Sequence, residues 1–232
     1  MDRALIVLLG AVVAAVGVIG VAAIWLTVTT DDGDPIVLEP GVTEGVSFPA
    51  IDHDPAGAAA LVTAWQRWRT ASFVSVGTWT RTIDARPDEP LTGDVYVAQA
   101  PPRRLVVRLG SVVERHGDEV SACSVSDQVV IAPPCVAGEG LAYDTLVEYE
   151  LGLVERYVTG PSRLYDVARS SVDCFRAELV VPALASPWGR WAEYCFDEQT
   201  GALRSARVRR RSATDVELVG SIRAEVRDDD FG

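Results

Sequence analysis

Four cysteines are the residues of this sequence with the clearest chemical potential: Cys123, Cys135, Cys174 and Cys195. An even number of cysteines in a domain outside the cytoplasm is typical of disulfide bonds, and four cysteines allow three pairings. A zinc site is the alternative, but the sequence lacks the close C-x-x-C spacing of such sites and contains only two histidines. We therefore predict two disulfide bonds, no metal site and no cofactor.

The spacing of the cysteines favours one of the three pairings. Cys174 and Cys195 lie on two strand-like runs, SVDCFRAELVV and RWAEYCF, on either side of the segment PALASP. If these runs form a hairpin, the two cysteines face each other, and cross-strand Cα atoms about 4.5–5.5 Å apart suit a disulfide. Cys123 and Cys135 flank a short segment that can close on itself. The predicted bridges are Cys123–Cys135 and Cys174–Cys195.

Motifs of enzymatic chemistry are absent from the sequence. It contains no G-x-S-x-G nucleophile elbow, no P-loop and no H-E-x-x-H zinc motif. His53 lies in an acidic segment and His116 beside a Gly-Asp turn, and we interpret both as solvated surface residues. With the cysteines paired, no thiol remains as a nucleophile. The sequence therefore predicts a protein that is not an enzyme.

The densest group of basic residues lies near the C-terminus, where Arg207, Arg209 and Arg211 alternate with other residues. In a strand, this spacing places the three side chains on one face. One interpretation is a solvated edge strand that is protected by charge. The other is a contact for an anionic headgroup or an acidic partner. The sequence leaves both interpretations open.

The charge of the whole chain limits its partners. The 232 residues have a formal net charge of −12. Such a charge argues against nucleic acid, or an anionic bilayer surface, as the main partner.

An uncharged apolar stretch, residues 4–28, is long enough to cross a bilayer as a helix, since about 20 apolar residues suffice. Arg3 precedes it and no basic residue follows until Arg67, so the positive-inside rule places residues 1–3 in the cytoplasm. A cleaved signal peptide is the alternative, but its apolar core is only about 7–15 residues long. We predict a single-pass anchor in the cell membrane, with the C-terminal part of the chain outside the cytoplasm.

The rest of the chain is predicted to contain a linker and one domain. Residues 29–56 form an acidic, proline-containing linker, and residues 57–232 form the extracytoplasmic domain. A helix should start at Asp54-Pro55, with Leu61, Trp65 and Trp68 on its buried face.

A second helix is expected within residues 141–158, with Leu146, Tyr149, Leu153 and Tyr157 on one face, or as two helices with a break at Gly152. The remaining elements are strands close together in sequence, which favours an antiparallel meander. In one of them, Leu105, Val107 and Leu109 alternate with Arg104, Val106 and Arg108, so one face is more polar. The expected strands are Phe73–Ile83, Gly93–Ala98, Arg103–Leu109, Val112–Arg115, Glu119–Cys123, Gln128–Ala132, Arg163–Val167, Val172–Val181, Arg190–Phe196, Ala202–Arg210 and Asp215–Val226.

Three phrases, GDVYVAQAPPRRLVVRLG, RLYDVARSSVDCFRAELVV and YCFDEQTGALRSARVRR, resemble the lipoprotein-carrier (LolA-like) superfamily. That superfamily includes mycobacterial lipid-binding lipoproteins and envelope-stress sensor domains. The resemblance implies an α+β fold, in which a curved antiparallel incomplete β-barrel has helices over its mouth. It also implies an apolar cavity between the sheet and the helices.

The predicted membrane anchor, the antiparallel meander and the resemblance to the lipoprotein-carrier superfamily lead to one prediction. The chain is expected to be a membrane-anchored extracytoplasmic protein that binds a lipid or another apolar ligand. The alternative is a non-enzymatic signalling or structural module that binds a protein of the cell envelope.

Overall fold

The computed structural model describes residues 51–124, 135–180 and 186–232. The predicted membrane span, residues 29–50 of the predicted linker and the expected strand Gln128–Ala132 lie outside these residues. Within the part that is described, no helix is long and apolar enough to cross a membrane.

The described residues from Ile51 onward belong to one compact unit and form two α-helices, eleven strands and one 3₁₀ helix. The helices are α1 (Pro55–Thr70) and α2 (Tyr143–Val158), and the 3₁₀ helix is η1 (Asp228–Phe231). The strands are β1 (Phe73–Ile83), β2 (Arg86–Ala100), β3 (Arg103–Arg108), β4 (Ser111–His116), β5 (Glu119–Ser124), β6 (Cys135–Glu139), β7 (Tyr165–Ser171), β8 (Cys174–Leu179), β9 (Trp191–Phe196), β10 (Leu203–Arg209) and β11 (Ala213–Arg223).

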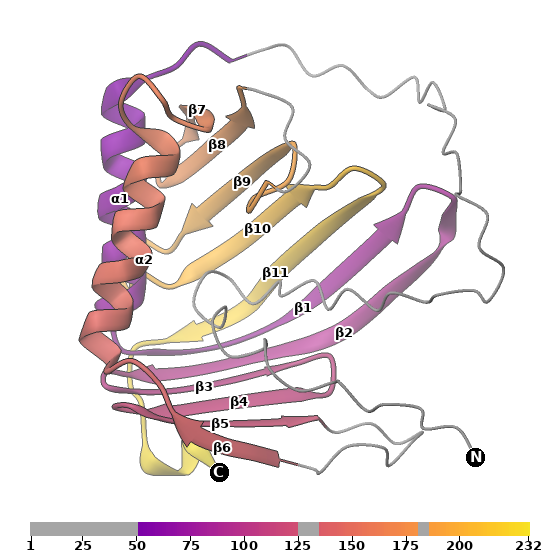
Figure 1. Cartoon of the computed structure of the whole chain (residues 1–232). Helices are drawn as coiled ribbons and strands as arrows, with labels where there is room; N and C mark the ends of the chain where they lie inside the picture. The colour runs from indigo at the N-terminus through magenta and orange to yellow at the C-terminus, as the bar shows by residue number, and fades with distance from the viewer. Residues whose placement is uncertain (1–50, 125–134, 181–185) are drawn as a thin grey trace, which may run out of the picture. The chain divides into compact units, whose positions relative to one another are not determined.

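All eleven strands belong to one antiparallel sheet, in the order β6-β5-β4-β3-β2-β1-β11-β10-β9-β8-β7. The pairing of β1 with β11 joins two meanders that are far apart in the sequence. The sheet is curved and does not close, so β6 and β7 are its two edges, and the two helices pack on it (Figure 1). The predicted α+β class with an incomplete antiparallel barrel is confirmed at this level.

Helix α1 begins where the sequence predicts. The side chain of Asp54 accepts a hydrogen bond from the backbone N–H of Ala56 at 3.0 Å, and Pro55 occupies the first helical position. Leu61, Trp65 and Trp68 are buried, as predicted. The helix therefore presents its aromatic side chains to the sheet.

Trp65 is the centre of the aromatic core between α1 and the sheet. It is fully buried, and its ring lies 5.5 Å from that of Trp188, 5.4 Å from that of Tyr194 and 6.4 Å from that of Phe196, measured between centroids. Because Tyr194 and Phe196 belong to β9, these contacts identify the face of the sheet that packs on the helices. We call this face the inner face.

Helix α2 differs from its prediction in two respects. It continues through Gly152, so the interpretation as two helices is wrong. Tyr149 is 56% exposed, whereas Glu150 is fully buried, so the buried face is rotated from the one expected. The reason is Arg69 of α1, which forms an ion pair with Glu150 and compensates the burial of its charge.

The opposite, outer face of β1–β4 is covered by the C-terminal segment. Phe231 packs with Val74, Ala98 and Leu105 in a small hydrophobic cluster. The hydroxyl of Tyr96 donates a hydrogen bond to the carbonyl oxygen of Asp230 at 2.9 Å. The acidic residues that precede Phe231 thus belong to a packed turn, which the sequence analysis did not predict.

Candidate functional site

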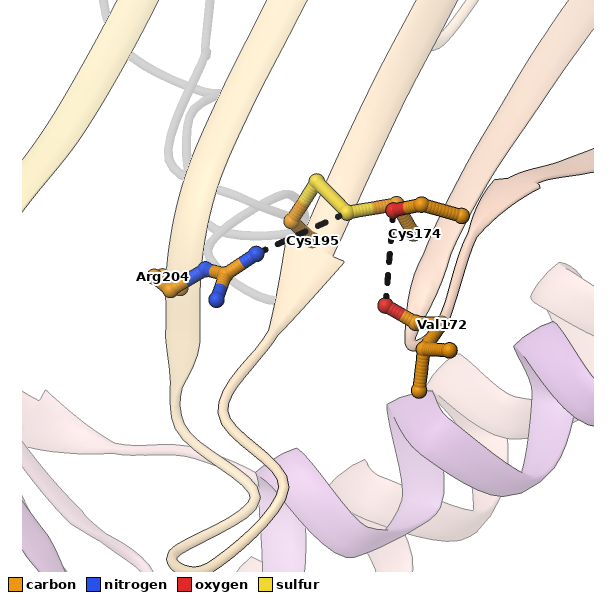
Figure 2. Close-up of a disulfide and its surroundings, with 5 residues drawn as sticks. Val172, Cys174, Cys195 and Arg204 are labelled. Atoms are coloured by element: carbon orange, nitrogen blue, oxygen red, sulfur yellow. Dashed lines mark hydrogen bonds between the residues drawn. A yellow bond between two sulfur atoms is a disulfide. The ribbon is translucent and has the colours of Figure 1, made fainter.

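The disulfide Cys174–Cys195 lies across neighbouring positions of β8 and β9, where the sequence analysis expected it. The Cα atoms are 4.0 Å apart, and both residues are buried. Arg204 of β10 points its guanidinium toward this bridge, with Nη2 3.8 Å from the sulfur of Cys174 (Figure 2). The bridge therefore ties two neighbouring strands of the sheet together.

The disulfide Cys123–Cys135 pairs β5 with the edge strand β6, again in the predicted pairing. All five residues of β6 are exposed, so little burial holds this strand in place. The cross-link and the ladder to β5 are what retain it. Among the described residues, no group of three or more His, Cys, Asp or Glu side chains is arranged to hold a metal ion.

The two bridges should differ in what their removal does. Replacing Cys174 and Cys195 by alanine should lower the free energy of unfolding by about 3 kcal/mol. This is the chain-entropy estimate for a loop of the length that the Cys174–Cys195 bridge closes. Replacing Cys123 and Cys135 should mainly free β6. Urea denaturation measures the first effect and amide hydrogen exchange of β6 the second. Equal exchange of β6 with and without its bridge would contradict this assignment.

The arginine-rich strand is not an edge strand, so that interpretation is wrong. β10 lies between β9 and β11. Its alternation buries Ala206 and Val208 on the inner face and places Arg207 and Arg209 on the outer face. Arg207 is exposed, and Arg211 is exposed in the turn that follows. A role of these arginines as a headgroup or partner contact stays a prediction.

Arg209 already has a partner within the chain. Its Nη1 and Nη2 donate to the two carboxylate oxygens of Asp84 at 2.6 and 2.8 Å. The hydrogen bonds from Arg209 lower the pKa of Asp84. This bidentate pair fixes the β1–β2 turn against the end of β10.

His53 is not the solvated residue that we expected. Its Nδ1 accepts a hydrogen bond from the backbone N–H of Val167 at 3.3 Å, and the N–H of Asp54 donates to the carbonyl oxygen of Val167 at 2.7 Å. Both bonds lie along the edge strand β7. Residues assigned to the linker therefore help to cover one edge of the sheet. His116 ends β4 and is exposed, as expected.

The inner face carries a row of charged side chains. The pairing registers place Arg104 and Arg108 of β3 on this face, the same face as Trp79 of β1 and Glu217 of β11. We call the whole set the inner charge row; its members are Arg69, Arg81, Arg104, Arg108, Arg115, Arg210, Glu150, Asp215 and Glu217. Among the residues that the structure describes, six arginines thus face three carboxylates in this row, in a chain whose total charge is negative.

At the end of the row near the helices, Arg69 of α1 and Glu150 of α2 form a buried bidentate pair. Nε of Arg69 donates to Oε2 of Glu150 at 2.6 Å, and Nη2 donates to Oε1 at 3.2 Å. Their side chains are 2% and 1% exposed. The hydroxyl of Tyr143 donates to the carbonyl oxygen of Arg69 at 2.7 Å. Together these contacts join the two helices.

At the other end, Asp215 of β11 accepts hydrogen bonds from two arginines. Nε of Arg81 and Nε of Arg210 each lie 2.6 Å from a carboxylate oxygen of Asp215. Burial acts to raise the pKa of Asp215, but the two guanidinium groups outweigh it and the pKa is lowered. This carboxylate is therefore ionised and fully engaged at neutral pH.

Trp79 and the pair Arg108–Glu217 connect the two ends. Nη2 of Arg108 lies 3.0 Å from Oε2 of Glu217, and the guanidinium carbons of Arg81 and Arg108 lie 5.1 and 5.4 Å from the centroid of the Trp79 ring. Such distances suit cation–π contacts. Burial raises the pKa of Glu217, although Arg108 and Arg104 oppose it.

Arg104 lacks a carboxylate partner of its own. Within the described residues, no Asp or Glu oxygen lies within ion-pair distance of it, and its buried Nε has no hydrogen-bond acceptor. Its guanidinium carbon lies 5.7 Å from the centroid of the Trp68 ring. The pKa of Arg104 is lowered to about 9, mainly by burial and to a lesser extent by the charge of Arg69.

Sequence reasoning found the alternation of β3 but not its direction. Leu105 packs with Phe231 on the outer face, whereas Arg104, Val106 and Arg108 face the helix side. The signal available was Phe231, an isolated apolar residue in an acidic tail, which has to pack somewhere.

Several solved structures are distantly similar to this chain. A LolA superfamily protein of Nitrosomonas europaea is 9% identical, with a TM-score of 0.32, over 76% of this chain and 97% of its own. The lipoprotein LppX of Mycobacterium tuberculosis is 14% identical, with a TM-score of 0.36, over 75% of this chain and 98% of its own. A DUF1329 family protein of Desulfovibrio piger is 10% identical, with a TM-score of 0.33, over 78% of this chain and 98% of its own.

No protein-family model and no curated protein matches the chain. The sequence analysis predicted a resemblance to the LolA superfamily, and a protein of that superfamily is among the distantly similar solved structures. At this level of identity, the match concerns the fold alone.

Proposed function

We propose that this chain is an envelope protein, anchored by residues 4–28, that holds a lipid or another apolar ligand against the inner face of its sheet. The observation that carries the proposal is the exposure of aliphatic side chains on that face. Val106 and Val113 pair across β3 and β4 and remain half-buried, and Val136 of β6 is 63% exposed. An unclosed sheet leaves such a face available to an acyl chain.

Three further features support this proposal. Both disulfides agree with an oxidising compartment, as expected for a domain outside the cytoplasm. The inner face also combines aliphatic residues with a short row of polar groups, which is the usual composition of a ligand site. The apolar span at residues 4–28 would keep the domain at the membrane, where apolar ligands are abundant.

Photocrosslinking with a fatty alcohol that carries a diazirine in its chain tests the proposal. The full-length protein in lipid nanodiscs should be labelled at Val106 and Val113. The adjacent Val107 and Val112 pair with each other on the outer face and serve as internal controls. Labelling confined to residues 4–28, or equal labelling of both faces, would contradict the proposal.

A protein partner in the envelope is a second candidate. It is favoured by two large apolar side chains on the outer face of neighbouring strands, Val76 of β1 (45% exposed) and Leu218 of β11 (56% exposed). A photoreactive residue introduced at position 218 should then capture one specific protein in membranes. The absence of any protein adduct would remove this candidate.

A further inference from the structure

Buried donors without acceptors gather at one point of the inner face. Arg69 is 1% exposed, and its Nη1 is buried without a hydrogen-bond partner. Arg104 has a buried, unpartnered Nε as well. The guanidinium carbons of Arg69 and Arg104 lie 5.5 and 5.7 Å from the centroid of the same Trp68 ring. Two cations with free N–H groups thus share one neighbour.

Three carboxylate oxygens near these donors are already in use. Both carboxylate oxygens of Glu150 accept from Arg69, and Oε2 of Glu217 is held by Arg108. Gln99 pairs with Arg104 across β2 and β3. Its Nε2 donates hydrogen bonds to the carbonyl oxygens of Trp68 and Ala71. Its Oε1 has no donor. The described residues therefore do not complete the hydrogen bonding of Arg104.

Buried polar groups in proteins are almost always paired, and buried charges are paired or neutralised. A water molecule can accept the free N–H bonds, but it does not neutralise the excess of positive charge in the inner charge row. An anion does both. A carboxylate or phosphate also matches the planar arrangement of guanidinium donors.

We propose that the ligand of the inner face is an anionic amphiphile, whose carboxylate or phosphate accepts hydrogen bonds from Arg104, with Nη1 of Arg69 as the second donor of the cluster. This inference rests on the proposed function and adds the chemical class of the headgroup. The acyl chain lies along the aliphatic residues of β3 and β4, beginning with Val106, which is two residues from Arg104 on the same face.

Electrostatics give the site its selectivity. The chain as a whole is strongly acidic, so anions are repelled from most of its surface. Among the described members of the inner charge row, arginines outnumber carboxylates, and no carboxylate of the described residues lies within ion-pair distance of Arg104. A neutral headgroup leaves the charge of Arg104 uncompensated, whereas an anionic headgroup compensates it.

The test compares two diazirine probes with identical chains, the fatty alcohol and its phosphate monoester, on the full-length protein in nanodiscs of a zwitterionic lipid. The phosphate probe should half-saturate the labelling of Val106 and Val113 at a concentration at least about tenfold lower than that needed for the alcohol. The reason is that one hydrogen bond between charged groups raises the affinity by about this factor. Arg104→Gln should abolish this preference, and Arg104→Lys should retain part of it.

Arg207→Gln is the matched control, because Arg207 is exposed on the outer face. It should leave the preference for phosphate unchanged. If Arg207→Gln removes the preference and Arg104→Gln does not, the headgroup lies on the outer face and the inference is wrong. Arg104→Lys guards against a folding defect, since both Arg104 variants should give the wild-type labelling by the alcohol.

The remaining outcomes separate this inference from the proposed function. Equal labelling of the inner face by the two probes overturns the anionic headgroup but supports an apolar ligand. No labelling by either probe overturns both. An excess of inorganic phosphate should not displace the phosphate probe. If it does so at the concentration at which the probe itself binds, the site takes a free anion, and the amphiphile is excluded.

Discussion

Glu150→Gln should lower the free energy of unfolding by about 3–5 kcal/mol, the usual cost of removing one partner of a buried ion pair. The substitution leaves the guanidinium of Arg69 buried without its carboxylate. It also leaves Arg69 beside Arg104, so two cations repel each other without an intervening negative charge. Urea denaturation of the full chain with its disulfides intact measures the change.

Two variants serve as controls for this prediction. Glu148→Gln on the exposed side of α2 should change the stability by less than about 0.5 kcal/mol. Replacing both members, Arg69→Met with Glu150→Leu, should recover most of the loss, because apolar side chains of similar volume often substitute for a buried pair without cost. A double variant as unstable as Glu150→Gln would contradict the explanation by an unpaired charge.

Trp65→Ala should cost about 3–5 kcal/mol, the range for deleting a large aromatic side chain from a packed core. Trp65 is fully buried, and it joins α1 to Trp188 and to two residues of β9, Tyr194 and Phe196. Its removal leaves a cavity at the point where the helix meets the sheet. Thermal and urea unfolding, both monitored by near-ultraviolet circular dichroism, should show this loss of stability.

The control for Trp65 is Tyr149→Ala. Tyr149 is an aromatic residue of α2 with more than half of its surface exposed, so its removal should change the stability by less than about 0.5 kcal/mol. Trp65→Phe should fall between the two, since it keeps part of the packing. A loss for Tyr149→Ala equal to that for Trp65→Ala would mean that the aromatic core is not where the helix is attached.

Local signals in the sequence predicted most of the hairpins and both disulfides. Strand pairs that follow each other directly, such as β8 and β9, need only a turn and an alternating pattern, and their cysteines then fall opposite each other. The start of α1 was equally local, because Asp54 and Pro55 determine it without any distant contact.

Distant contacts explain what the sequence did not reveal. The pairing of β1 with β11 joins segments more than a hundred residues apart, and no local pattern encodes it. Glu150 is buried only because Arg69 on another helix compensates it. β3 turns its arginines inward because Phe231, at the far end of the chain, covers its apolar side. The inner charge row therefore appears only once the sheet is assembled.

Native mass spectrometry of the full-length protein, released gently from the membranes in which it was made, tests most directly whether the inner face holds a ligand. We expect one bound amphiphile per chain, with a negatively charged head and at least one acyl chain, and a lower occupancy in Arg104→Gln than in Arg207→Gln. A protein with both disulfides intact and only the mass of the bare chain would contradict the claim that its inner face holds a ligand.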